Sequence, residues 1–193
     1  NKEAARLCMM RRRLPEATKH YEKATEVMDS DFHAWALLLT CYGAQGDKAK
    51  IRHAAEKMVS ESQRALQLDP SNGAALGIIA GGFATLGEAD RAREWIERAM
   101  LIDPDNLNMR YNFACVLARQ LNDPMAALDL LEPTFAEEPP FFMMRLAMTD
   151  PDRDTMREEP RFKDMMAAAR KRLGIKAPGR ATAPAAAVAP LHS

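Results

Sequence analysis

The sequence predicts an all-α fold, a solenoid of antiparallel helix hairpins with a C-terminal helical cap. The main observation is a repeat: residues 65–72 (ALQLDPSN) and 99–106 (AMLIDPDN) are similar segments that lie 34 residues apart. A 34-residue period ending in Asp-Pro is typical of helix-turn-helix arrays. The second observation is an apolar content of 47% over 193 residues, which suffices for a buried core. The third is the pair Pro139-Pro140, which no regular helix can continue through, so the array is expected to end there.

The first two predicted units differ in length from the period. Residues 1–31 are interpreted as a partial first repeat. Residues 32–72 are a repeat of 41 residues, seven more than the period. Seven residues make two helical turns, so the apolar face shifts by only about 20°. We therefore expect the second helix of this repeat, about residues 48–68, to be seven residues longer than its counterparts and to project past them.

The remaining units follow the period and then leave it. Residues 73–106 are a regular repeat and residues 107–140 are the last repeat. Residues 141–173 are predicted to form a helical cap, because a repeat array needs a final element that covers its last apolar face. Residues 174–193 are rich in Ala and Pro and poor in charge, so a disordered tail is expected.

Side chains at fixed spacings within these units follow a known repeat pattern. Its first helix is matched by Trp35, Leu38, Leu39 and Tyr42, by Leu76, Ile79, Ala80 and Phe83, and by Arg110, Phe113, Ala114 and Leu117. Its second helix is matched by Gly87, Ala92, Ile96, Ala99 and Pro104, and one residue late by Ala127 and Leu131. Over roughly residues 1–135 the chain resembles the tetratricopeptide repeat (TPR) family. This resemblance implies a right-handed α-solenoid whose concave face binds a segment of another protein.

In that family the first helix of each hairpin lines the concave face. The resemblance therefore implies a partner-binding groove made by residues between the core positions. These are His33, Leu37 and Thr40, then Ala74, Gly77, Ile78 and Gly81, then Asn108, Tyr111, Asn112, Cys115 and Arg119. The small residues in the middle leave room for a side chain or helix of a partner. A clamp for a terminal carboxylate, as some family members have, is disfavoured because only Asn112 and Arg119 suggest one.

The last part of the chain resembles a particular group of proteins that contain such repeats. Residues 105–170 are similar to the C-terminal repeat segments of bacterial multidomain signalling proteins, notably adenylate/guanylate cyclases with tetratricopeptide repeats. Together with a first residue, Asn1, that is not Met, this predicts that the chain is a piece of a longer protein. A catalytic or DNA-binding domain is then expected upstream.

Composition argues against several classes of protein. A net charge of zero and a pI near 7.1 argue against a general nucleic-acid binder, which needs excess Lys and Arg. Three scattered cysteines favour a reducing compartment, and we expect a cytoplasmic location. No apolar run reaches the length that spans a membrane, and no signal peptide is predicted from these residues.

Neither a metal site nor a catalytic site is predicted. Asp150, Asp152 and Asp154 have the spacing that opens a calcium loop, but Thr155 stands where glycine is needed and Arg161 where glutamate is needed. The four histidines are not paired at helical spacing, and no glycine loop for phosphate occurs. We expect no metal, no cofactor and no catalytic residue in this chain.

Charge is uneven near the end of the chain. Residues 120–152 carry a net charge of −6, and residues 153–180 carry +5. We favour the interpretation that the two segments lie against each other over the alternative that they form a partner site.

The predicted function is a non-catalytic protein-protein interaction module, the regulatory or docking segment of a bacterial signalling protein. It would bind a peptide or helix in the groove, with no nucleic acid and no membrane as partner. One alternative is the C-terminal part of a nucleotide cyclase whose catalytic domain lies outside this chain. Another is a self-association module that forms a homo-oligomer through the long helix at 48–68 and the charged segments.

Overall fold

The computed structural model describes residue 8, residues 13–136, residues 144 and 156, and residues 158–175. Within these residues the fold is all-α, as predicted, and contains no strand. The helices are α2 (Leu14–Val27), α3 (Phe32–Gln45), α4 (Lys48–Leu68), α5 (Gly73–Thr85), α6 (Ala89–Ile102), α7 (Leu107–Cys115), the π-helix η1 (Val116–Gln120), α8 (Pro124–Ala136) and α11 (Pro160–Arg172).

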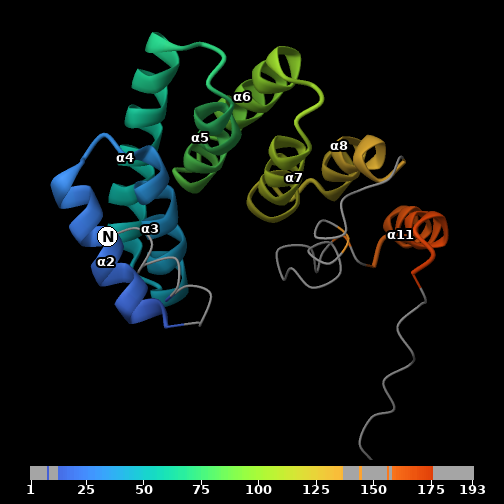
Figure 1. Ribbon diagram of the computed structural model, residues 1–193, viewed down its shortest axis with the longest axis horizontal. Helices are drawn as coiled ribbons and strands as arrows, with labels where there is room; N and C mark the ends of the chain where they lie inside the picture. Colours follow the sequence, from blue (N-terminus) through green and yellow to red (C-terminus); the bar gives the residue numbers. More distant parts are fainter. Residues whose placement is uncertain (1–7, 9–12, 137–143, 145–155, 157, 176–193) are drawn as a thin grey trace, which may run out of the picture.

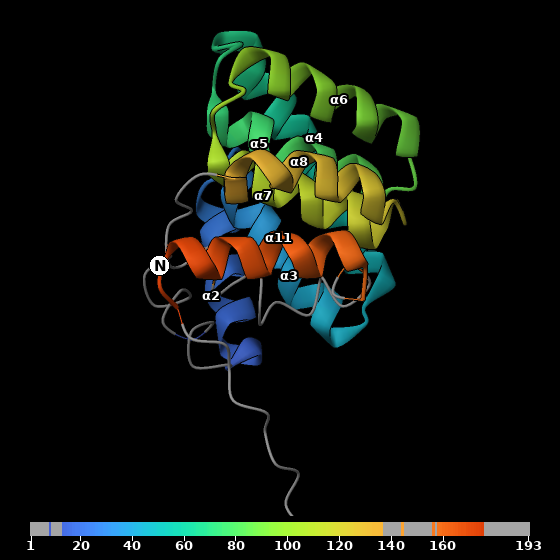
Figure 2. The ribbon, with the colours of Figure 1, turned by 90° about the vertical axis from the view of Figure 1, so that its right-hand side faces the viewer.

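Successive helices pack as antiparallel pairs that follow one another along the molecule (Figure 1). The pairs are α3 with α4, α5 with α6, and α7 with its continuation η1 against α8. At one end α2 packs on α3, and at the other end α11 packs on α8, alongside it in Figure 2. The first helices of neighbouring pairs, α5 and α7, also contact each other.

Each first helix begins with the same kind of cap. The side chains of Asp31, Asn72 and Asn106 accept a hydrogen bond from the backbone N–H three residues ahead, at 3.2, 3.1 and 3.0 Å. Such side chains satisfy N–H groups that have no partner within the helix, and each cap contributes about 1 kcal/mol. The same local chemistry therefore starts all three pairs.

The turn inside each pair also recurs. Gly46, Gly87 and Asn122 have positive φ angles of 72°, 82° and 51° at matching positions. Glycine and asparagine are the residues that adopt this conformation with least strain. The next residue starts the second helix, and Asp47 and Asp123 cap it by accepting an N–H at 3.1 Å.

The long second helix has the bounds expected from the sequence. α4 comprises 21 residues and α6 comprises 14. In Figure 1 the C-terminal part of α4 extends beyond α3. Two core clusters divide on α4 between adjacent residues: Met58 belongs to a cluster with α2 and α3, and Val59 belongs to a larger cluster with the later helices. Because α3 and α5 pack on different parts of α4, they hardly contact each other.

In the last repeat the second helix matches the pattern one residue late, and the extra residue lies in η1. The cap Glu88 lies sixteen positions after Asn72, whereas Asp123 lies seventeen positions after Asn106. The extra residue widens one turn, and the N–H of Leu121 bonds the carbonyl of Val116 at 3.0 Å, five residues back. π-turns of this kind are rare and often occur at functional sites.

The two charged segments near the end of the chain do meet. Arg161 of α11 donates to Asp129 at 2.6 Å and to Glu132, both on α8. Arg172 donates to the carbonyl of Phe135. These contacts confirm, for the described residues, that the basic segment lies against the acidic one. Residues 1–7 and 9–12 of the predicted first repeat lie outside the described residues, as do most of residues 141–157 of the cap and the tail from 176 onwards.

Candidate partner-binding groove

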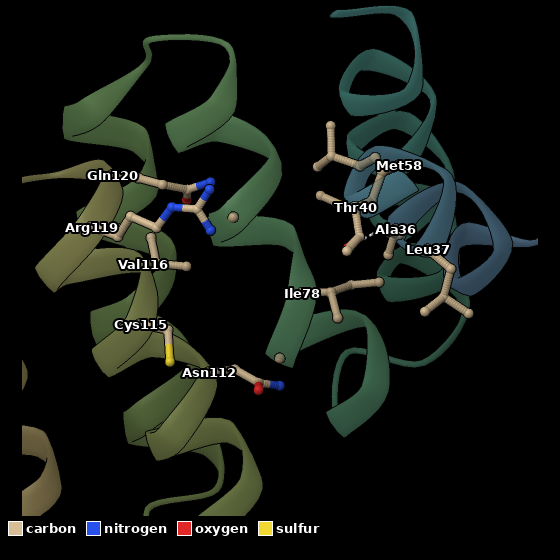
Figure 3. Close-up of a pocket in the computed structure, with 13 residues that line it drawn as sticks. Ala36, Leu37, Thr40, Met58, Ile78, Asn112, Cys115, Val116, Arg119 and Gln120 are labelled. Atoms are coloured by element: carbon tan, nitrogen blue, oxygen red, sulfur yellow. Dashed lines mark hydrogen bonds between the residues drawn. The ribbon is translucent and has the colours of Figure 1, made fainter. Parts of the chain in front are cut away.

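A hollow of about 370 Å³ lies between α3 on one side and α7 with η1 on the other, with α5 as its floor. We call it the central hollow (Figure 3). It is lined by Ala36, Leu37, Leu39, Thr40, Met58, Gly77, Ile78, Gly81, Asn112, Cys115, Val116, Arg119 and Gln120. The hollow exists because α3 stands away from α5, and this also lets Met58 of α4 reach its surface.

The two sides of the central hollow differ in chemistry. Figure 3 shows Ala36, Leu37 and Thr40 on the α3 side, facing the opposite side across Ile78. Leu37 is a large apolar side chain that is 36% exposed. The opposite side carries Asn112, Cys115, Arg119 and Gln120 beside Val116. One wall therefore offers apolar surface, and the other offers amide and guanidinium groups.

The floor is deep because two of its residues have no side chain. A Cβ added at Gly77 would lie 3.7 Å from Met109 Cγ, and one at Gly81 would lie 3.6 Å from Val116 Cγ2. Both distances are ordinary van der Waals contacts, so close helix packing does not require glycine at either position. The effect of these two glycines is to leave space above α5.

A second hollow of about 330 Å³ continues the first toward the N-terminal ends of the helices. We call it the N-terminal hollow. It shares Gly77, Ile78 and Asn112 with the central hollow and adds His33, Gly73, Ala74, Asn106, Asn108 and Met109. The two hollows together form one groove along α5. A helix of 13 residues is about 20 Å long, so the groove has room for about three turns of a partner helix.

The structure brings eleven of the twelve predicted groove residues together. The central hollow contains Leu37, Thr40, Gly77, Ile78, Gly81, Asn112, Cys115 and Arg119, and the N-terminal hollow contains His33 and Asn108. The neighbouring Ala74 also lines the N-terminal hollow.

Tyr111 is the exception, and its predicted placement is wrong. It is 8% exposed and lines neither hollow. Its counterpart one period earlier is Gly77, which faces Met109 of the next first helix. At the same position in α7, the larger side chain of Tyr111 is buried.

Sequence reasoning missed eight lining residues: Ala36, Leu39, Met58, Val116 and Gln120 in the central hollow, and Gly73, Asn106 and Met109 in the N-terminal hollow. Val116 and Gln120 reach the groove through η1, and the only sequence signal for them is the match that comes one residue late at Ala127. Ala36 and Met58 line it because α3 and α5 diverge. The seven extra residues of α4 signal this divergence, but a repeat register alone assigns Met58 to the core.

A partly exposed polar network outside the groove links α2, α3 and α4. The Tyr42 hydroxyl donates to Glu22 at 2.9 Å, and Lys50 lies 3.1 Å from the same oxygen. Burial, followed by the hydrogen bond to Glu22, raises the pKa of the Tyr42 hydroxyl above its usual range. Burial also raises the pKa of the Cys41 thiol. Both side chains belong to the core and neither lines the groove.

Other kinds of site were sought over the same described residues. No group of three or more His, Cys, Asp or Glu side chains that could hold a metal ion was found among them. None of the described helices is long and apolar enough to cross a membrane.

Comparison with known proteins adds no relative. No family model matches the chain, and no curated protein matches it.

Proposed function

We propose that this chain is a non-catalytic protein-interaction module with a TPR-like array, and that its groove binds a peptide or helical segment of a partner protein. The observation that carries this proposal is the groove itself, a trough along α5 with one apolar and one polar wall. Grooves that bind peptides combine apolar surface for affinity with a few polar groups for orientation. The matching caps and turns of the three pairs support a repeat array of the predicted kind.

On the similarity of residues 105–170 to bacterial signalling proteins, we further propose that the module is a regulatory or docking segment of such a protein. In that setting any catalysis belongs to another part of the parent protein. The proposed partner of the groove is a protein, with no nucleic acid or membrane bound to this segment.

The test is a selection of displayed 14-residue peptides on the full 193-residue chain, followed by affinity measurements on two matched variants. Leu37→Gln removes an apolar side chain from the groove. Leu101→Gln makes the same change on α6 at a site that is 85% exposed and outside the groove. Selected peptides should bind Leu37→Gln about tenfold more weakly, the order expected for the loss of one leucine contact of about 1.5 kcal/mol.

Binding to Leu101→Gln should equal binding to the wild type, and both variants should keep the wild-type melting temperature. Peptides that bind all three proteins equally would place the binding surface elsewhere and refute the groove.

A further inference from the structure

The groove carries charge of one sign only. Of the described residues that line its two hollows, none has a carboxylate, and Arg119 is an arginine at one end. The other polar groups are uncharged amides, a hydroxyl and a thiol, together with the His33 imidazole. Asp103 bonds Asn106 at 2.8 Å, at the opposite end of the groove from Arg119. A partner that meets the polar wall therefore meets hydrogen-bond donors and a guanidinium group, and no lining carboxylate repels an acidic side chain.

The π-turn in η1 determines which side chains lie at the Arg119 end of the groove. Asp123 lies seventeen positions after Asn106, so the first helix of the last pair carries one residue more than that of the pair before it, and η1 contains this residue. Gln120 then reaches back to α5, where its amide donates to the Thr85 hydroxyl at 3.1 Å. Thr85 in turn donates to the carbonyl of Gly81 at 2.8 Å, on the groove floor. This chain of hydrogen bonds ties η1 to α5 and fixes the backbone next to Arg119, whose side chain lies at the groove in Figure 3.

The length and the open side of the groove suit a helix. The two hollows run along α5, between α3 and α7 with η1. Because α5 has 13 residues, a partner helix of about three turns can lie along it. A helix in this position turns one face to Leu37 and Ile78 and an adjacent flank to Arg119.

We propose that the groove binds an amphipathic helix with an acidic flank, and that η1 positions Arg119 to pair with carboxylates on that flank. This inference rests on the proposed function and specifies its partner class. Apolar residues at helical spacing would contact the α3 wall. Glutamate or aspartate side chains would lie toward η1, where the charge pairing sets orientation more than affinity.

The experiment uses a displayed library of 14-residue helical peptides with leucines along one face and Glu, Lys, Gln or Ala varied on both flanks. It is selected on the full chain and counter-selected on Leu37→Gln. We expect enrichment of Glu on one flank only. Binding of these peptides should fall about fivefold in Arg119→Gln, remain in Arg119→Lys, and weaken as salt is raised. The matched control is Arg64→Gln, which removes a 72% exposed arginine from α4 outside the groove and should change nothing.

A charge exchange makes the test independent of folding effects. Arg119→Glu should lose the Glu-flanked peptides and bind the corresponding Lys-flanked peptides more tightly than the wild type does. Proline in the middle of a selected peptide should abolish its binding, because it breaks the helix.

The outcomes separate the two proposals. Peptides that depend on Leu37 but show no acidic preference, no response to Arg119→Gln or no loss with proline would overturn this inference and leave the groove standing. Absence of any Leu37-dependent peptide would overturn the proposed function as well.

Discussion

At the scale of single residues, the glycines of α5 serve different purposes. A Cβ at Gly82 would lie 2.5 Å from Val59 Cγ2 and 2.7 Å from Met58 Cε, so this glycine permits close packing of α5 on α4. Val59 is β-branched and cannot move aside by a simple rotation. Gly77 and Gly81 have ordinary space for a Cβ and instead deepen the groove.

Alanine substitutions should separate these roles. We expect Gly82→Ala to lower the free energy of unfolding by about 1–3 kcal/mol through overpacking. Gly77→Ala should leave it unchanged or raise it by up to about 1 kcal/mol, because alanine favours the helix and fits. Urea denaturation at 25 °C measures both changes. A Gly82→Ala variant as stable as Gly77→Ala would contradict the close packing described for α4 and α5.

Part of the groove could be predicted from residues alone. The repeat register places Leu37, Ile78 and Asn112 at one position in three copies, and the structure finds all three in the groove. The register failed for Tyr111, which is buried and lines neither hollow. It also gave no indication of Gln120, since no propensity distinguishes a π-turn from a helical turn with one more residue.

At the scale of elements, α8 begins with the same kind of cap as the other second helix that has one, α4, although η1 before it contains one extra residue. Asp123 accepts the N–H of Ala126 at 3.1 Å and a hydrogen bond from Arg93 at 2.9 Å. The backbone hydrogen bond is the largest cause that lowers the pKa of this carboxyl, Arg93 adds to it, and burial opposes it. The insertion in α4 differs from that in η1. Because it adds about two full turns, it preserves the helical phase, and the bounds of α4 could be predicted from the length of the repeat alone.

The stability contributed by Asp123 should depend on pH. Its folded pKa is lower than its unfolded pKa of about 3.9, so its contribution is complete above that value and is lost as the pH falls through the folded pKa. We expect Asp123→Ala to cost about 0.5–2 kcal/mol at pH 7, the usual value of an N-cap, and less below about pH 4.

The matched control is Glu88→Ala, at the equivalent position of α6, where the side chain makes no capping bond. Its cost should be smaller and vary less with pH. Urea denaturation of the three proteins from pH 7 to pH 3 makes the comparison. An Asp123→Ala deficit that stays constant over this range would contradict the role assigned to the ionised carboxylate.

At the scale of the whole molecule, two core clusters of unequal size share one helix. The smaller includes Leu38 and Met58 with residues of α2 and α3, and the larger extends from Val59 through α5 to α11. In repeat arrays each unit is stabilised mainly by its neighbours. Since α3 hardly contacts α5, the first helices are coupled to the rest chiefly through α4.

Native-state hydrogen exchange should therefore report two opening free energies. Backbone amides of α2 and α3 should exchange at least about tenfold faster than those of α5 and α7, a difference of about 1.4 kcal/mol. Leu38→Ala, in the smaller cluster, should increase exchange in α2 and α3 and leave α5 to α8 nearly unchanged. Leu76→Ala, an equally buried leucine in the larger cluster, should increase exchange in α5 to α8. Uniform protection along the chain would show a single cooperative unit.

The seven-residue insertion in α4 and the one-residue insertion in η1 change different properties of the groove. Two added turns in α4 separate the flanking walls and so set its breadth, whereas one added residue in η1 selects the side chains at its end. Both insertions leave the helical phase at the next cap nearly unchanged, because one is close to two whole turns and the other is accommodated in η1 before Asp123. Breadth and selectivity can therefore vary independently in such an array, each through a short change in length that leaves the interior side chains as they are.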